Sequence, residues 1–155
     1  MELQHYTDQI VALSQQEDLL QLGRPAGEIK QQFEDLLIEL ERQEQVKRLD
    51  ANDAGESYEE IDYKPLKEAF FEAYNQFVTK RKAQQQLQQT LETQNLKLKK
   101  DLITRLKEVI DNEEKIGTAF QAYKEIHETW KKIGAIPREH RETLQMEYSR
   151  LLEIF

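Results

Sequence analysis

Few residues in this chain have the types and spacing that metal or catalytic chemistry requires. Glu2 and His5 have the spacing of one di-iron ligand pair, but no second pair of this kind follows. Segment 50–61 begins like a calcium-binding loop, yet Ile61 stands where the bidentate Glu is required. There is no cysteine, no Gly-rich phosphate loop and no Ser/His/Asp pattern. We therefore predict no catalytic residue, no metal site and no cofactor, and expect a protein that is not an enzyme.

The composition indicates long helices. The 155 residues are 38% hydrophobic and 34% charged, with only five Gly and three Pro. No run of β-branched residues alternates with glycine turns, which excludes a sandwich, a barrel or a nucleotide-binding α/β domain. The chain has no basic-then-apolar leader, and no apolar run approaches the roughly 18 residues of a membrane span. We expect a cytoplasmic protein.

Hydrophobic spacing and breaker residues divide the chain into five helices. The expected helices cover about residues 3–20, 25–50, 65–111, 112–133 and 137–155. Gly23 is expected to end the first helix, and Gly134 to end the fourth with a left-handed C-cap. The predicted fold class is all-α: an extended antiparallel bundle or helical repeat with one very long central helix, four shorter helices and coiled-coil-like packing.

The same pattern predicts three segments. Residues 1–51 form an N-terminal helical hairpin that represents a degenerate repeat half, and residues 52–64 form an acidic loop. Residues 65–155 contain the long helix and a two-helix corner. Because the chain stops on the apolar face of the fifth helix, we expect the C-terminus to be truncated.

Two internal shifts of the sequence indicate repetition. A shift of 78 residues pairs Leu66, Phe70 and Phe77 with Leu144, Tyr148 and Phe155. A shift of 93 residues pairs Asp8, Ile10 and Leu13 with Asp101, Ile103 and Leu106. The pattern is typical of helical arrays in which each copy buries its apolar face against a neighbour.

The long helix carries the candidate partner-binding residues. Its apolar stripe thins at the glutamine-rich segment 84–90, which we interpret as solvated. Leu87, Leu91 and Leu98 continue the stripe around this segment, and we expect them to pack against a helix of a partner protein or of a second copy.

Charge is distributed unevenly along the chain, whose net charge is −8. Residues 1–63 hold 5 Lys and Arg against 16 Asp and Glu, whereas residues 64–155 hold 17 against 14. The candidate phosphate contacts are Lys80, Arg81, Lys82, Lys97, Lys99, Lys100, Lys131, Lys132, Arg138 and Arg141. A solvated helical face is the simpler interpretation, because Glu and Asp are interspersed.

Residues 120–148, FQAYKEIHETWKKIGAIPREHRETLQMEY, carry a more specific motif. They resemble the bacterial domain-of-unknown-function family 349, and the resemblance extends over residues 65–155. The matching positions are Phe120, Tyr123, Trp130, Ile133, Gly134, Ile136, Pro137, Leu144 and Tyr148. In the first copy Gln43 stands near the place of the Trp. We interpret these residues as a structural corner between two helices, and the resemblance implies no activity.

These observations favour a non-enzymatic helical repeat module for protein–protein interaction or scaffolding. The alternative is an RNA- or ribosome-associated protein that uses the basic residues of 64–155. Neither interpretation involves a membrane or a small-molecule substrate.

Overall fold

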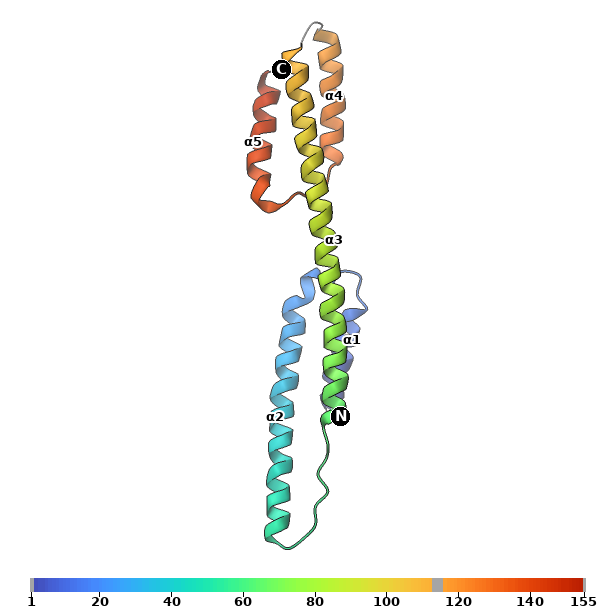
Figure 1. The fold of residues 1–155 in the computed structure, drawn as a ribbon, viewed down its shortest axis with the longest axis vertical. Coiled ribbons are helices and arrows are strands. Elements are labelled where there is room, and N and C mark those ends of the chain that lie inside the picture. The colour runs from blue at the N-terminus through green and yellow to red at the C-terminus, as the bar shows by residue number, and fades with distance from the viewer. Residues whose placement is uncertain (1, 113–115, 155) are drawn as a thin grey trace. The chain divides into compact units, whose positions relative to one another are not determined.

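The structure is a computed structural model that describes residues 2–112 and 116–154. Within these residues the chain forms five α-helices and one short 3-10 helix, and no β-strand (Figure 1). The elements are α1 (Glu2–Ser14), η1 (Leu20–Leu22), α2 (Gly23–Asp53), α3 (Lys64–Asp111), α4 (Ile116–Lys132) and α5 (Arg138–Ile154). The prediction of an all-α fold with one very long helix and four shorter ones is confirmed.

Helix α3 is continuous over 48 residues. It contains no Gly, its single Pro is Pro65 in the first turn, and it is rich in Leu, Gln, Lys and Glu. The Asp62 carboxylate accepts a hydrogen bond from the backbone N–H of Lys64 at 3.0 Å, which satisfies one of the free amides at the start of the helix. At 1.5 Å per residue the helix is about 72 Å long.

Helix α2 ends at Asp53, a few residues later than the predicted Asp50. The backbone N–H of Glu56 bonds the carbonyl of Ala51 at 2.8 Å, and that of Gly55 bonds the carbonyl of Asn52 at 3.1 Å. Gly55 has φ +73°, so these bonds form a Schellman motif with a glycine in the left-handed conformation. The loop before α3 therefore covers residues 54–63.

The first predicted helix boundary is wrong. Helix α1 ends at Ser14, and Gly23 begins α2 in the right-handed helical conformation instead of ending a helix. The reason is packing: the chain leaves the helix so that Leu19, fully buried, reaches the core between the helices. Hydrophobic spacing alone placed Leu20 in the same stripe as Leu13 and could not detect this turn.

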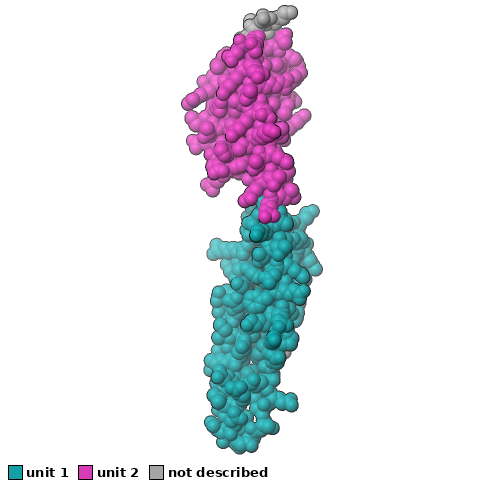
Figure 2. Space-filling view, in the orientation of Figure 1, with its two compact units in different colours: residues 1–85 teal, residues 86–155 magenta. Residues whose placement is uncertain are grey.

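The chain divides into two compact units, residues 1–85 and 86–155 (Figure 2). Unit 1 contains α1, η1, α2 and the first part of α3, and unit 2 contains the rest of α3 with α4 and α5. The boundary between the units lies inside the long helix α3, whereas the predicted boundary was the acidic loop of residues 52–64. No helix among the described residues is both long enough and apolar enough to cross a bilayer.

Each unit has its own core of three helices. In unit 1, Phe33 of α2 and Phe70 of α3 stack with ring centroids 3.9 Å apart, and both are fully buried. In unit 2, Trp130 of α4 and Tyr148 of α5 stack at the same distance. Stacking of aromatic rings adds to the hydrophobic stabilisation of the buried side chains.

Burial supports the internal repeat more fully than the sequence matches did. The shift of 93 residues continues from α1 through α2 and pairs residues that are buried or half-buried in both cores. The pairs are Leu3 and Leu96, Ile10 and Ile103, Leu13 and Leu106, Ala26 and Ala119, Phe33 and Ile126, Leu37 and Trp130, and Leu40 and Ile133. Helix α3 thus combines the third helix of the first copy with the first helix of the second. The predicted match of Phe77 with Phe155 lies outside the described residues.

Candidate functional site

The three predicted partner-binding leucines lie in the unit 2 part of α3 and are exposed. The exposed fractions of Leu87, Leu91 and Leu98 are 61%, 50% and 51%. Their spacings of four and seven residues place them on one side of the helix. This leucine stripe, defined by Leu87, Leu91 and Leu98, is an apolar surface that the described part of the chain leaves uncovered.

The helix around the first two leucines of the stripe, Leu87 and Leu91, is poor in charge. Residues 84–96 contain one charged side chain, Glu92, in a chain that is 34% charged. Gln88 donates to Glu92 at 3.3 Å, and Thr90 donates to the carbonyl of Gln86 at 3.0 Å, so several polar groups bond within the helix itself. Covering the Leu87–Leu91 part of this surface would desolvate few charges, which lowers the cost of helix–helix contact there.

Three polar residues of α3 hold the connection between α1 and α2. Gln84 accepts the backbone N–H of Leu19 at 2.8 Å and donates to the carbonyl of Glu17 at 3.0 Å. The Arg81 guanidinium donates to the carbonyls of Leu19 and Leu20 at 3.2 and 3.1 Å. Lys80 donates to the carbonyl of Ser14. The glutamine-rich segment is therefore only partly solvated, because its first residue, Gln84, is hydrogen-bonded to the α1–α2 connection.

Gly23 leaves room for the Arg81 guanidinium at this connection. A Cβ atom at Gly23 would lie 2.9 Å from the Arg81 guanidinium, whereas a Cβ atom at Gly27 would meet nothing within 4 Å. We expect Gly23→Ala to displace Arg81 from its two carbonyls and to lower the free energy of unfolding by about 1–3 kcal/mol. Gly27→Ala, inside the same helix, should raise it by about 0.5–1 kcal/mol. Urea denaturation of both variants checks this, and equal stabilities would contradict the close approach.

The α4–α5 corner is built around an aromatic cluster. The Trp130–Tyr148 stack is capped on one side by Lys99, whose ammonium lies 4.5 Å from the Trp130 ring centroid. His127 Nδ1 lies 2.8 Å from the Tyr148 hydroxyl oxygen and forms a hydrogen bond with it. Burial raises the pKa of Tyr148 to about 12 and lowers the pKa of Lys99. The Tyr148 hydroxyl therefore keeps its proton at neutral pH.

Most of the predicted corner residues lie in this cluster or beside it. Trp130, Ile136, Leu144 and Tyr148 are buried, and Tyr123 and Ile133 are half-buried against the same core. Pro137 is half-buried just before α5, and its carbonyl accepts the N–H of His140 at 3.0 Å. Phe120 departs from the pattern, because its exposed fraction is 49%.

The predicted left-handed C-cap at Gly134 is wrong. Its φ is not positive, and the connection is instead bonded by Asn95 of α3. The Asn95 amide donates to the carbonyl of Ala135 at 2.8 Å, and a Cβ atom at Gly134 would make only an ordinary van der Waals contact with it at 3.4 Å. A side chain of α3 thus holds the connection of the other two helices here, as Gln84 does in unit 1.

The predicted phosphate contacts have different surroundings. Lys80 and Arg81 bond backbone carbonyls in unit 1, Lys99 covers Trp130, and Arg141 donates to the carbonyl of Ile136 at 3.0 Å. The remaining residues are exposed: Lys82, Lys97, Lys100, Lys131, Lys132 and Arg138. Unit 2 contains 12 basic and 12 acidic residues, so the net charge of −8 belongs to unit 1.

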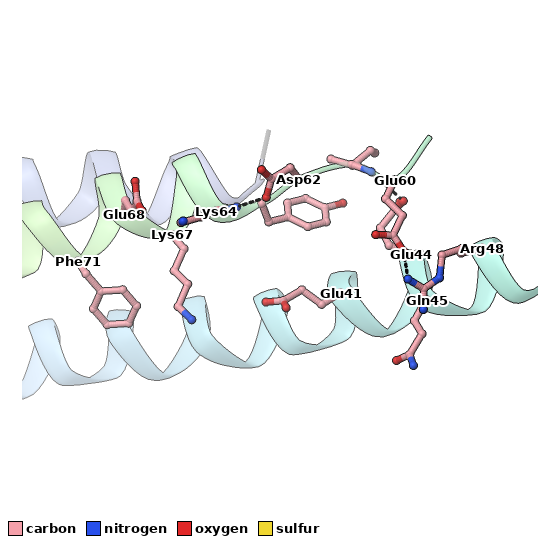
Figure 3. Close-up of a pocket in the computed structure, with 12 residues that line it drawn as sticks. Glu41, Glu44, Gln45, Arg48, Glu60, Asp62, Lys64, Lys67, Glu68 and Phe71 are labelled. Carbon is pink, nitrogen blue, oxygen red and sulfur yellow. Dashed lines mark hydrogen bonds and ion pairs between the residues drawn. The ribbon is translucent and has the colours of Figure 1, made fainter. Parts of the chain in front are cut away.

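A groove of about 830 Å³ lies in unit 1 between α2, the 54–63 segment and the start of α3 (Figure 3). Five acidic and three basic side chains line it. Lys67 extends from α3 towards α2, and Arg48 of α2 pairs with Glu60 of the segment at 3.1 Å. The groove was not predicted from the sequence, because the acidic loop has no regular apolar spacing that indicates which helix it packs against.

One buried carboxylate joins the segment to α2. Glu44, only 5% exposed, accepts the Tyr58 hydroxyl at 2.5 Å and the backbone N–H of Ile61 at 3.1 Å. These two hydrogen bonds hold the pKa of the Glu44 carboxyl below its ordinary value. The bond to Glu44 also raises the pKa of Tyr58 to about 12. A sequence signal for this exists: Glu44 follows Phe33, Leu37 and Leu40 at helical spacing, on the apolar side of α2.

The fold defines an all-helical protein of two three-helix units that share one long helix. The model of the family described as Domain of Unknown Function (DUF349) matches residues 65–139, which cover α3, α4 and the connection to α5. This match confirms the resemblance to the family that the motif in residues 120–148 indicated. Neither the comparison with curated proteins nor the comparison with solved structures finds a match.

Proposed function

We propose that this protein is a non-enzymatic helical module that binds a helix of another protein molecule through the leucine stripe of α3. The observation that carries the proposal is the stripe itself: three leucines at least half exposed, at helical spacing, with only Glu92 and Lys97 charged between Leu87 and Leu98. Pairing with an amphipathic helix would bury them by helix-in-groove or coiled-coil packing. The corner and the α1–α2 connection have a structural role in this proposal, since they hold each unit together.

The alternative is RNA binding by the exposed lysines and arginines. It is less supported, because unit 2 is neutral overall and four of the ten candidate residues contact the chain itself. Binding that depends on phosphate contacts weakens steeply with salt, whereas apolar helix pairing does not. This difference separates the two functions experimentally.

A photo-crosslinker at Gln94, beside the leucine stripe, tests the proposal in cell extract treated with nuclease. We expect the 155-residue chain to crosslink a discrete protein, which can be this chain itself, at both 50 and 300 mM salt. The variant Leu87→Gln/Leu91→Gln/Leu98→Gln should lose at least 90% of that product, because the apolar contact is removed while the helix is kept.

The matched control is Val78→Gln, which changes an apolar residue of α3 that is 42% exposed and belongs to unit 1. This variant should crosslink like the unmodified chain. Crosslinking that survives the triple substitution would refute the leucine stripe. A product that disappears with nuclease or at the higher salt concentration would support the RNA alternative instead.

A further inference from the structure

We propose that the 54–63 segment is a strap that the ionised carboxylate of Glu44 holds closed over α2, and that neutralising this carboxylate opens it. The inference is independent of the leucine stripe, which lies in the other unit. It rests on the geometry of the one buried polar attachment point of the strap and on the position of that point in the core-facing side of α2.

The attachment of the strap converges on one atom. The Tyr58 hydroxyl and the Ile61 N–H both donate to Oε2 of Glu44, at 2.5 and 3.1 Å. Hydrogen bonds to an ionised acceptor are roughly twice as strong as neutral ones. Two donors that share one anionic oxygen therefore lose much of their attraction together when the charge is removed.

The other charges around Glu44 cannot hold the strap equally well. On α2, Lys47 lies 3.8 Å from the second Glu44 oxygen and has a side chain 58% exposed. The ion pair of Arg48 with Glu60 of the strap is about half exposed on both sides, where such pairs contribute little. From α3, the cations Lys64 and Lys67 and the anion Glu68 line the groove. Among the described residues neither lysine forms an ion pair with Glu44, whose ion-pair partner is Lys47.

Because residue 44 is a glutamate and not an apolar residue, closure of the strap depends on the state of its carboxylate. Phe33, Leu37 and Leu40 precede Glu44 at spacings of four, three and four residues, so an apolar side chain would continue the core at this position. An apolar side chain at position 44 would stay buried in the core whether the strap is open or closed. A buried carboxylate must instead keep its hydrogen-bond donors or regain water. Opening therefore concerns the strap before Tyr63, which is itself buried in the unit 1 core.

The pH dependence follows from the lowered pKa of the Glu44 carboxyl. The unfolded or open chain has the ordinary carboxyl pKa of about 4.3, and the closed strap favours the ionised form. The stabilisation of the closed strap is therefore complete above about pH 4.3 and is lost as the pH falls through the lowered pKa of Glu44.

NMR relaxation of the whole chain tests the strap directly. For the unmodified chain at pH 7, backbone order parameters near 0.85 are expected at positions 58–61, as in rigid structure. Glu44→Gln keeps the shape and an acceptor oxygen but removes the charge, and we expect its order parameters to fall below about 0.6 at pH 7. Tyr58→Phe should move the acid titration of the Ile61 amide shift upward, towards the ordinary carboxyl pKa.

The matched control is Glu41→Gln. Glu41 lines the same groove, one helical turn before Glu44, and is exposed. This variant should keep the order parameters and the titration of the unmodified chain. An ordered strap in Glu44→Gln at pH 7 would overturn the proposal, because closure would then not depend on the charge. Equal loss of order in both glutamate variants would overturn it as well, since the effect would not belong to Glu44.

Discussion

Replacing Trp130 with Ala is expected to lower the free energy of unfolding by about 3–5 kcal/mol. Trp130 is 7% exposed, stacks on Tyr148 at 3.9 Å and supports Lys99 on its other face. The truncation removes the largest side chain of the unit 2 core and leaves a cavity between α4, α5 and α3. Chemical denaturation measures the total loss, and amide exchange of α4 and α5 shows where it occurs.

Phe120→Ala is the control for Trp130→Ala. Phe120 is also an aromatic residue of α4 and of the family motif, but its exposed fraction is 49%. We expect the change in its free energy of unfolding to stay within about 0.5 kcal/mol, as for other surface substitutions. If the two variants lost similar stability, or if Trp130→Ala melted like the unmodified chain, the structural role of the corner would be refuted.

Replacing Phe70 with Ala should destabilise unit 1 by about 3–5 kcal/mol. The Phe70 ring is fully buried, stacks on Phe33 at 3.9 Å and meets the edge of Phe71 at 5.5 Å. Its removal opens a cavity between α2 and α3 and leaves the Phe33 ring without its partner. Amide exchange in α1 and α2 should accelerate accordingly.

Val78→Ala, in the same helix, is the control for Phe70→Ala. Its side chain is 42% exposed, so the expected loss is below about 0.5 kcal/mol. Because the two cores are separate clusters of buried residues, the Phe70 variant should affect exchange in unit 1 first. A variant whose α2 amides exchange as slowly as those of the unmodified chain would contradict the assigned core.

The repeat shows how much a sequence pattern can predict and where it stops. Three matches for each shift were visible from residue types, since Leu, Ile and aromatic residues recur at core positions. The correspondence between Leu37 and Trp130 was not visible, because the side chains differ in kind and share only their burial, 5% and 7% exposed. The motif instead suggested Gln43 as the counterpart of Trp130, and Gln43 is exposed.

Polar residues at helix connections were the least predictable part of the candidate sites. Gln84, Arg81 and Asn95 lie on a continuous helix, and nothing in their local sequence distinguishes them from solvated neighbours. Each side chain is hydrogen-bonded to a backbone carbonyl or amide group of a residue that is 40 or more positions away in the sequence. Such bonds depend on which connection lies beside the helix, and periodicity carries no information about that.

The sequence by itself determined the helical class, the length of α3 and the family motif, because these follow from local propensity and spacing along one helix. The leucine stripe is exposed, and its contact with a partner stays a prediction. Only the tertiary structure decided that the two compact units divide after Gln85, that Gly23 lies close to the Arg81 guanidinium, and that Glu44 binds the 54–63 segment. The physical reason is that these features depend on long-range contacts, which form only when separate helices bring their side chains together.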